Sequence, residues 1–196
     1  RGRQAVPTLR QLMTHTAGLR CHLELAVFNG VRTVPARYPL AAQVRQEGVN
    51  FEPGEDFLYS NGGYYLLSLA LERASGRSYA DLVRDYCGAP AGLRATSAPR
   101  RPWPLEAGVA TQYAPEGDGW RHVPALLEEH LGDGCMVSTV DDLLNWLAYL
   151  RASTGPVSLA TLAVQTPLTN GRSSGYGFGL TTEYWRGVRL VHHGGL

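Results

Sequence analysis

The sequence predicts an α+β fold, with helices in the middle of the chain and antiparallel strands late in it. Apolar residues repeat at helical spacing through residues 62–75 and 140–150, whereas residues 176–193 show strand patterns on either side of a tight turn. The chain has 196 residues, of which 44% are apolar and 18% are charged. A chain of this length and composition can bury a substantial core, so we expect an ordered domain or a large part of one.

The first expected helix follows Thr8, whose hydroxyl can cap a helix N-terminus, and ends at Gly18, which fits the left-handed position after a helix. Residues 19–38 show no clean period and are expected to be irregular. Residues 40–46 are expected to form a short helix, and Pro53-Gly54 to force a turn. The N-terminal part should therefore hold two short helices joined by irregular segments.

The strongest helix signal covers residues 62–75. Ser60 or Asn61 can cap its start, and Gly76 can end it. Four side chains are spaced to share one face of this helix, namely Tyr64, Leu67, Leu71 and Ala74. A further helix is expected to open at Ser78, with an aspartate three residues later as a variant of the capping box.

The later part of the chain shows strand, helix and strand patterns in turn. Residues 109–113 and 120–123 are expected to form strands around a turn rich in proline and glycine. A helix is expected over residues 140–150, capped by Thr139 or Ser138 and carrying two aspartates that complement its dipole. Residues 176–184 and 188–193 are expected to pair as a hairpin.

Charge and composition exclude several classes of function. The formal net charge is +1 and the isoelectric point is about 7.9, so no strong field attracts nucleic acid or an anionic membrane. The sequence has no run of 18 apolar residues, so no membrane span is expected in it. The three cysteines form no Cys-x-x-Cys pair, and the spacing of His15, Cys21 and His22 matches no common zinc site. We therefore expect no metal and no other cofactor.

One segment, Tyr59-Ser60-Asn61, places polar groups where a ligand could bind. It brings a phenol, a hydroxyl and an amide to the entrance of the strongest helix, soon after a Pro-Gly turn. A phenol has a pKa near 10 and acts as a base only where nearby cations lower that pKa. The alternative is that Ser60 or Asn61 only caps the helix while Tyr59 packs against the core.

A second candidate segment, Val191-His192-His193-Gly194-Gly195, ends a strand pattern. Glycine lets a ligand approach the strand edge closely, and a histidine beside it can supply a proton or a positive charge near neutral pH. The alternative is a hairpin end with two solvent-exposed histidines. The glycines of residues 175–179 lie in an aromatic strand pattern, which indicates a bulge or close packing rather than a nucleotide loop.

Four segments, taken in order, resemble blocks of one protein family. Residues 9–19 (LRQLMTHTAGL) are similar to its LRxLLTHTSGL block, and residues 51–64 (FEPGEDFLYSNGGY) to its FxPGxxFxYSNxGY block. Residues 134–142 (GCMVSTVDD) are similar to GGLxSTxxDL, and residues 192–195 (HHGG) to HxGG. The family is the serine β-lactamase and penicillin-binding-protein superfamily, in its branch of class C-like β-lactamases, esterases and D-aminopeptidases.

The resemblance implies a β-lactamase/transpeptidase-like fold and acyl transfer through a serine ester, on an ester, amide or β-lactam substrate that is a small molecule or peptide-like. In this family an S-x-x-K motif supplies the nucleophilic serine and a lysine that helps to deprotonate it. By position, Tyr59 would pass the proton to the leaving group, and Asn61 would hydrogen-bond the substrate or the lysine. His192 would take the electrostatic role of the lysine in the family's K-T-G motif, and His193 and Gly194 would line the substrate groove.

The sequence departs from this pattern because it contains no lysine, and only eight residues precede Leu9, whereas the S-x-x-K motif lies upstream of that block. We therefore expect residues 1–196 to be the central part of a β-lactamase-related serine hydrolase domain, with a helical region and part of an antiparallel sheet, incomplete at both ends. This chain alone is not expected to catalyse acyl transfer, because it lacks the nucleophile. The alternative function is that of a catalytically inactive, ligand-binding member of the same fold.

Overall fold

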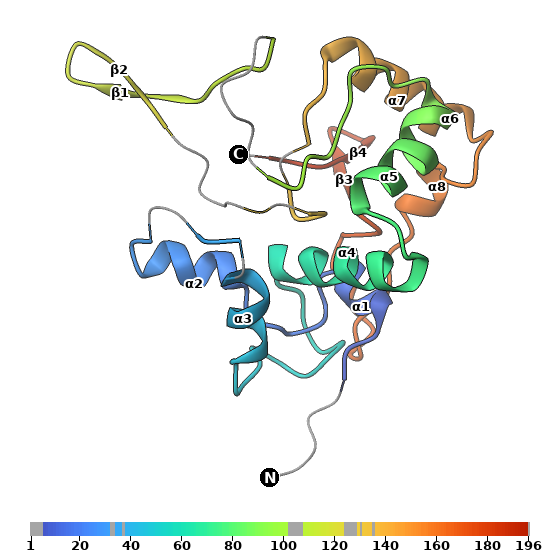
Figure 1. Ribbon diagram of the computed structural model, residues 1–196. Helices are drawn as coiled ribbons and strands as arrows, with labels where there is room; N and C mark the ends of the chain where they lie inside the picture. The colour runs from blue at the N-terminus through green and yellow to red at the C-terminus, as the bar shows by residue number, and fades with distance from the viewer. Residues whose placement is uncertain are drawn as a thin grey trace.

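The computed structural model describes residues 6–31, 34–36, 38–101, 108–123, 129, 131–134 and 136–195. In this part of the chain most of the helices pack on one another, and the strands form two separate antiparallel hairpins, of which the first projects away from the helices (Figure 1). None of the described helices is both long and apolar enough to cross a membrane. The arrangement confirms the predicted α+β fold.

Helix α1 (Leu9–Met13) begins with the cap expected at Thr8, whose hydroxyl accepts a hydrogen bond from the backbone N–H of Gln11. The helix ends at Met13 and not near Gly18, because His15 already takes a left-handed conformation with φ of 56°. Gly18 is also left-handed, but it does not end the helix. It lies against the backbone of Phe51, where a Cβ would be 1.9 Å from the carbonyl oxygen. The prediction of the helix start was confirmed, and that of its end was wrong.

Helix α2 (His22–Phe28) lies in the segment expected to be irregular, and helix α3 (Tyr38–Val44) lies close to the predicted short helix. The apolar residues of α2 show no helical period in the sequence, because Val27 and Phe28 are large and apolar and yet face solvent. The helix is held instead by a small core in which Ala26 and Val34 are fully buried. Tertiary packing outweighs periodicity in so short a helix.

Helix α4 (Asn61–Ser75) confirms the strongest prediction. The Ser60 hydroxyl accepts a hydrogen bond from a backbone N–H of the first turn, and Gly76 closes the helix in a left-handed conformation with φ of 67°. The buried face differs from the expected one, because it consists of Gly62, Gly63, Tyr65 and Ser68, while Leu71 is half exposed. Two glycines in the first turn let α1 and α3 approach α4 closely.

Helix α5 (Tyr79–Val83) opens at Ser78 as predicted and continues through the π-helical turn η1 (Arg84–Gly88) into α6 (Ala89–Ala91). Helix α7 (Val140–Ala152) is capped by Thr139, which was one of the two expected caps. Its residue Asp142 is buried and accepts hydrogen bonds from the backbone N–H groups of Arg94 and Ala95. This carboxylate therefore ties α7 to the loop after α6. Helix α8 (Leu159–Leu162) was not predicted.

The described strands form two hairpins. Strands β1 (Tyr113–Glu116) and β2 (Gly119–His122) pair antiparallel, with the first strand shifted toward the turn relative to the prediction. Strands β3 (Thr181–Trp185) and β4 (Val188–His192) pair around the predicted turn. The segment before β3 joins this sheet only through a bridge between Tyr176 and Thr181. Close packing there, as expected, requires Gly177, because a Cβ would lie 2.3 Å from the carbonyl oxygen of Leu162.

Candidate functional site

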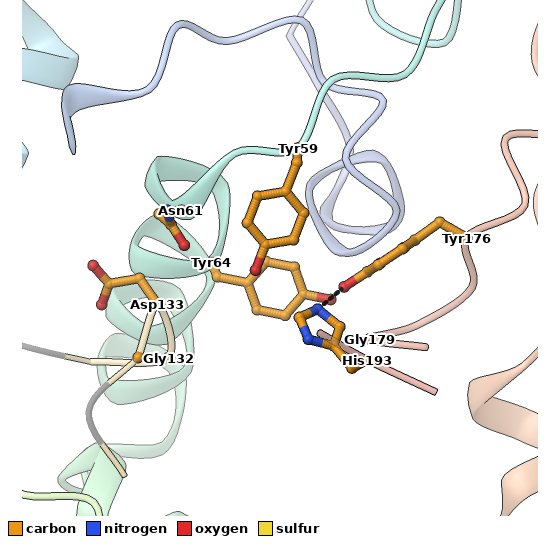
Figure 2. A pocket seen from close by; sticks show the side chains of 9 residues that line it. Tyr59, Asn61, Tyr64, Gly132, Asp133, Tyr176, Gly179 and His193 are labelled. Atoms are coloured by element: carbon orange, nitrogen blue, oxygen red, sulfur yellow. Dashed lines mark hydrogen bonds between the residues drawn. The ribbon is translucent and has the colours of Figure 1, made fainter. Parts of the chain in front are cut away.

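A pocket of about 270 Å³ lies where the entrance of α4, the loop before α7 and the β3–β4 region meet (Figure 2). Two of the residues predicted from the Tyr-x-Asn segment line it, and so does one histidine of the His-His-Gly-Gly segment. The described lining residues are Tyr59, Asn61, Tyr64, Gly132, Asp133, Gly134, Tyr176, Gly179 and His193. Segments more than a hundred residues apart in the sequence thus converge on one cavity.

Tyr59 extends into this pocket from the last residues before α4 (Figure 2). Its ring centroid lies 4.1 Å from that of His15 and 5.9 Å from that of His193. The neighbouring Ser60 caps the helix, as the alternative interpretation expected, while Tyr59 lines the pocket. Burial raises the pKa of the Tyr59 phenol above its usual value. With these surroundings the Tyr59 phenol is protonated at neutral pH.

The backbone on both sides of Tyr59 is fixed by His15. The N–H of Leu58 donates to the carbonyl oxygen of His15 at 3.0 Å, and the N–H of Ser60 donates to its ring Nδ1, also at 3.0 Å. An Nδ1 that accepts a hydrogen bond carries no proton, so the imidazole is neutral with its proton on Nε2. Burial lowers the pKa of His15 to about 4, in agreement with that geometry.

The two adjacent histidines point to different places. His192, predicted to be catalytic, is the last residue of β4 and places its Nε2 3.1 Å from a carboxylate oxygen of Glu183 on β3. His193, predicted to bind substrate, lines the pocket. His193 follows the end of β4, and its ring, unlike that of His192, is among those that line the cavity. Gly194 is exposed and is not among the described lining residues.

Sequence reasoning missed three polar side chains of the pocket, namely Tyr64, Asp133 and Tyr176. The Tyr64 hydroxyl donates to the carbonyl oxygen of Met13 at 2.8 Å, which ties the pocket floor to α1. The Tyr176 hydroxyl lies 3.0 Å from Nε2 of His193. An aromatic residue between two glycines in the Gly175–Gly179 segment was a signal for Tyr176, but it was interpreted only as packing. Nothing in the local pattern singles out Asp133.

Charge in the pocket is low. The described lining residues include no arginine, and the sequence has no lysine. Burial raises the pKa of Tyr64 to about 12 and also raises the pKa values of Tyr176 and of the Asp133 carboxyl. Within the described ranges, no group of three His, Cys, Asp or Glu side chains is arranged to hold a metal ion. The arrangement can donate protons and hydrogen bonds to a ligand.

Known structures share this architecture. The D-stereospecific amidohydrolase from Streptomyces sp. superposes with a TM-score of 0.76 over 100% of this chain and 63% of its own, at 26% sequence identity. The D-amino acid amidase from Ochrobactrum anthropi SV3, in complex with D-phenylalanine, superposes with a TM-score of 0.70 over 94% of this chain and 57% of its own, at 22% identity. These likenesses confirm the β-lactamase/transpeptidase-like fold.

Sequence comparison agrees with the structural one. The D-aminopeptidase of Brucella canis is 32% identical over 196 residues, which cover 96% of this chain and 37% of the relative. The D-aminopeptidase of Brucella anthropi is 30% identical over the same shares. The chain thus spans little more than a third of the length of these curated relatives. The sequence model of the Beta-lactamase family matches residues 1–196 in full, and the chain belongs to that family.

Proposed function

We propose that the protein containing this chain is a serine hydrolase that cleaves amide bonds through an acyl-enzyme, with amides or peptides of D-amino acids as its substrates. The observation that supports this most is the convergence of Tyr59, Asn61 and His193 on one pocket in a chain of the Beta-lactamase family. Among ester, amide and β-lactam substrates, the amide class is favoured because the similar proteins are a D-aminopeptidase and D-amino acid amidohydrolases.

In the proposed reaction, residues 1–196 are part of one hydrolase domain whose serine and lysine come from an S-x-x-K segment outside these residues. The serine oxygen bonds to the substrate carbonyl carbon, the C–N bond breaks, and the amine leaves with a proton. Water then adds to the acyl carbon, the bond to the serine oxygen breaks, and the serine regains its proton. The lysine of the S-x-x-K segment takes the serine proton as the serine oxygen bonds to the carbonyl carbon. Tyr59 delivers a proton to the leaving amine, since its phenol is protonated and faces the pocket, and the proton held by the lysine then passes to the Tyr59 oxygen.

Asn61 and His193 have binding roles in this proposal. The Asn61 amide can both donate to a substrate carbonyl and accept from an N–H group. His193 takes the position that the sequence analysis gave to His192, because it is the histidine that lines the pocket. An imidazole at that place can hold the acyl or carboxyl end of a substrate by hydrogen bonding. The alternative of an inactive, ligand-binding protein has no support from the D-aminopeptidase or the D-stereospecific amidohydrolase, whose names are those of hydrolases.

The test uses the full-length protein with paired D- and L-alanine p-nitroanilides and a fluorophosphonate probe for activated serines. We expect release of p-nitroaniline from the D substrate at least tenfold faster than from the L substrate, and covalent labelling by the probe. Replacing the serine of the S-x-x-K segment with alanine should abolish both signals. Absence of labelling together with absence of hydrolysis in the wild-type protein would overturn the proposal.

A further inference from the structure

Tyr176 contacts the pocket histidine directly. It lies just before β3, is 4% exposed, and places its hydroxyl 3.0 Å from Nε2 of His193 (Figure 2). The hydroxyl can either donate to a bare ring nitrogen or accept from a protonated one. The same contact therefore persists whichever protonation state His193 takes.

The second ring nitrogen of His193 fixes the tautomer. Its Nδ1 lies 2.5 Å from the carbonyl oxygen of Gly194, and a carbonyl oxygen can only accept a hydrogen bond. The proton of the neutral ring is therefore on Nδ1, and Nε2 is the acceptor for the Tyr176 hydroxyl. When His193 is protonated, Nε2–H donates to the same oxygen. Both ring nitrogens are then satisfied, and the imidazole has one orientation.

Tyr176 is itself held rigidly enough to orient a neighbour. Its ring packs edge-on against His15, with centroids 4.7 Å apart, and lies 5.7 Å from the ring of Phe57. The next residue, Gly177, donates its N–H to the carbonyl oxygen of Leu180 at 2.8 Å and lies against the backbone of α8. The hydroxyl thus has a position defined by buried rings and by backbone contacts.

We propose that Tyr176 is a positioning residue, which holds the His193 imidazole in the pocket and acts on acyl transfer through that ring. The role rests on the proposed function, since it gives His193 a part in binding the substrate. Tyr176 keeps its own proton throughout, because burial raises its pKa. It therefore contributes a constant hydrogen-bonding group and does not titrate with the reaction.

Several other titratable groups face His193 from the surrounding elements. His15 faces it from the turn after α1, Tyr59 and Tyr64 from the start of α4, and Asp133 from the loop before α7. Its neighbour His192 is paired with Glu183. All of these groups are present in both the wild-type protein and a Tyr176→Phe variant, so a difference between the two isolates the hydroxyl.

The experiment compares Tyr176→Phe with Tyr149→Phe in the full-length protein. Tyr149 is a matched control because it is also a buried tyrosine, and its hydroxyl has no hydrogen-bond partner among the described residues. We expect Tyr176→Phe to lower kcat/KM for D-alanine p-nitroanilide about tenfold, the factor expected for one hydrogen bond, and Tyr149→Phe to leave it unchanged. Equal values for the two variants would overturn the proposal.

Histidine-selective NMR measures the nitrogen chemical shifts of His193, which would not change if Tyr176 only stabilised the fold. Loss of the hydroxyl leaves Nε2 of His193 without its donor, so the nitrogen shifts of His193 should change in Tyr176→Phe and stay as in the wild type in Tyr149→Phe. The His193 signal is assigned by its absence in His193→Gln. In the wild-type protein, the nitrogen shifts of His193 should show the tautomer with its proton on Nδ1. The tautomer with its proton on Nε2 would overturn the proposal. This measurement needs no variant, so it decides the matter even if Tyr176→Phe fails to fold. Absent amidase activity would contradict the proposed function alone, because the NMR result does not depend on turnover.

Discussion

At the scale of single residues, Tyr59 is held by neighbours that leave it protonated. His15 fixes the backbone before and after it and stacks on its ring, while burial raises the pKa of the phenol. A phenol in such surroundings becomes a base only if a positively charged group lies beside it and lowers its pKa. The lysine of the family's S-x-x-K motif is the group that would do so. In the described pocket, Tyr59 is therefore placed to give a proton.

Tyr59→Phe in the full-length protein should lower kcat by about 10²–10⁴, the range for loss of a general acid or base. The ring and its stacking on His15 are retained, so the melting temperature should stay within about 2 °C of the wild type. Turnover is measured with D-alanine p-nitroanilide and stability by thermal unfolding. Near-normal turnover in the variant would remove Tyr59 from the mechanism.

Two buried histidines should make stability depend on pH. Burial lowers the pKa values of His15 and His22 to about 4, below the usual 6.5, so the unfolded chain binds protons that the folded one does not. Stability is therefore complete above pH 6.5 and declines as the pH falls toward 4, by up to about 1.4 kcal/mol per pH unit for each histidine.

Urea unfolding at pH 7 and pH 5 measures this dependence in the wild type and in His15→Gln. The variant should be less stable at pH 7, because it loses the packing of the imidazole and its bond from Ser60. Its stability should fall less between the two pH values, because one titrating group has been removed. A variant with the same pH dependence as the wild type would show that His15 is not neutral in the fold.

At the scale of elements, local chemistry predicted the starts of helices well. Thr8, Ser60, Ser78 and Thr139 all cap as expected, because a hydroxyl that accepts from a nearby backbone N–H needs no distant partner. Helix α2 was missed because its stability comes from packing against Val34 and not from its own pattern. For the same reason the buried face of α4 was misplaced.

The residues of the pocket also differ in whether local sequence or only tertiary structure reveals them. The Tyr-x-Asn segment was found because its residues are adjacent and lie at a recognisable helix entrance. The choice between His192 and His193 depends on how the chain leaves the end of β4, and two consecutive histidines carry no information about that. Tyr176 and Asp133 reach the pocket only through the tertiary fold.

Gly177 should be intolerant of a side chain because it lies against the backbone of α8. A Cβ would lie 2.3 Å from the carbonyl oxygen of Leu162, so Gly177→Ala should destabilise the protein by about 1–3 kcal/mol. Gly119→Ala is a matched control, since its Cβ would meet its nearest neighbour at an ordinary 3.8 Å. Chemical unfolding compares the two variants, and equal stabilities would show that the segment before β3 moves aside freely.

At the scale of the whole molecule, the fold brings one end of α4, the loop before α7 and the β3–β4 hairpin to a single cavity (Figures 1 and 2). The resemblance implied that Tyr59, Asn61 and His192 act at one site, whereas the described pocket is lined by Tyr59, Asn61 and His193. The chain spans 37% of the length of its curated relatives. In the proposed function, the nucleophile for this cavity comes from an S-x-x-K segment outside residues 1–196.

The most direct test of the shared cavity compares His193→Gln with His192→Gln in the full-length protein. Both variants replace an imidazole at neighbouring positions, but only His193 lines the pocket beside Tyr59, whereas His192 pairs with Glu183. The measurement is kcat/KM for D-alanine p-nitroanilide. We predict a loss of about tenfold to a hundredfold for His193→Gln, the range for one hydrogen bond to a charged group, and a change of less than about threefold for His192→Gln. The reverse order of effects would contradict the account.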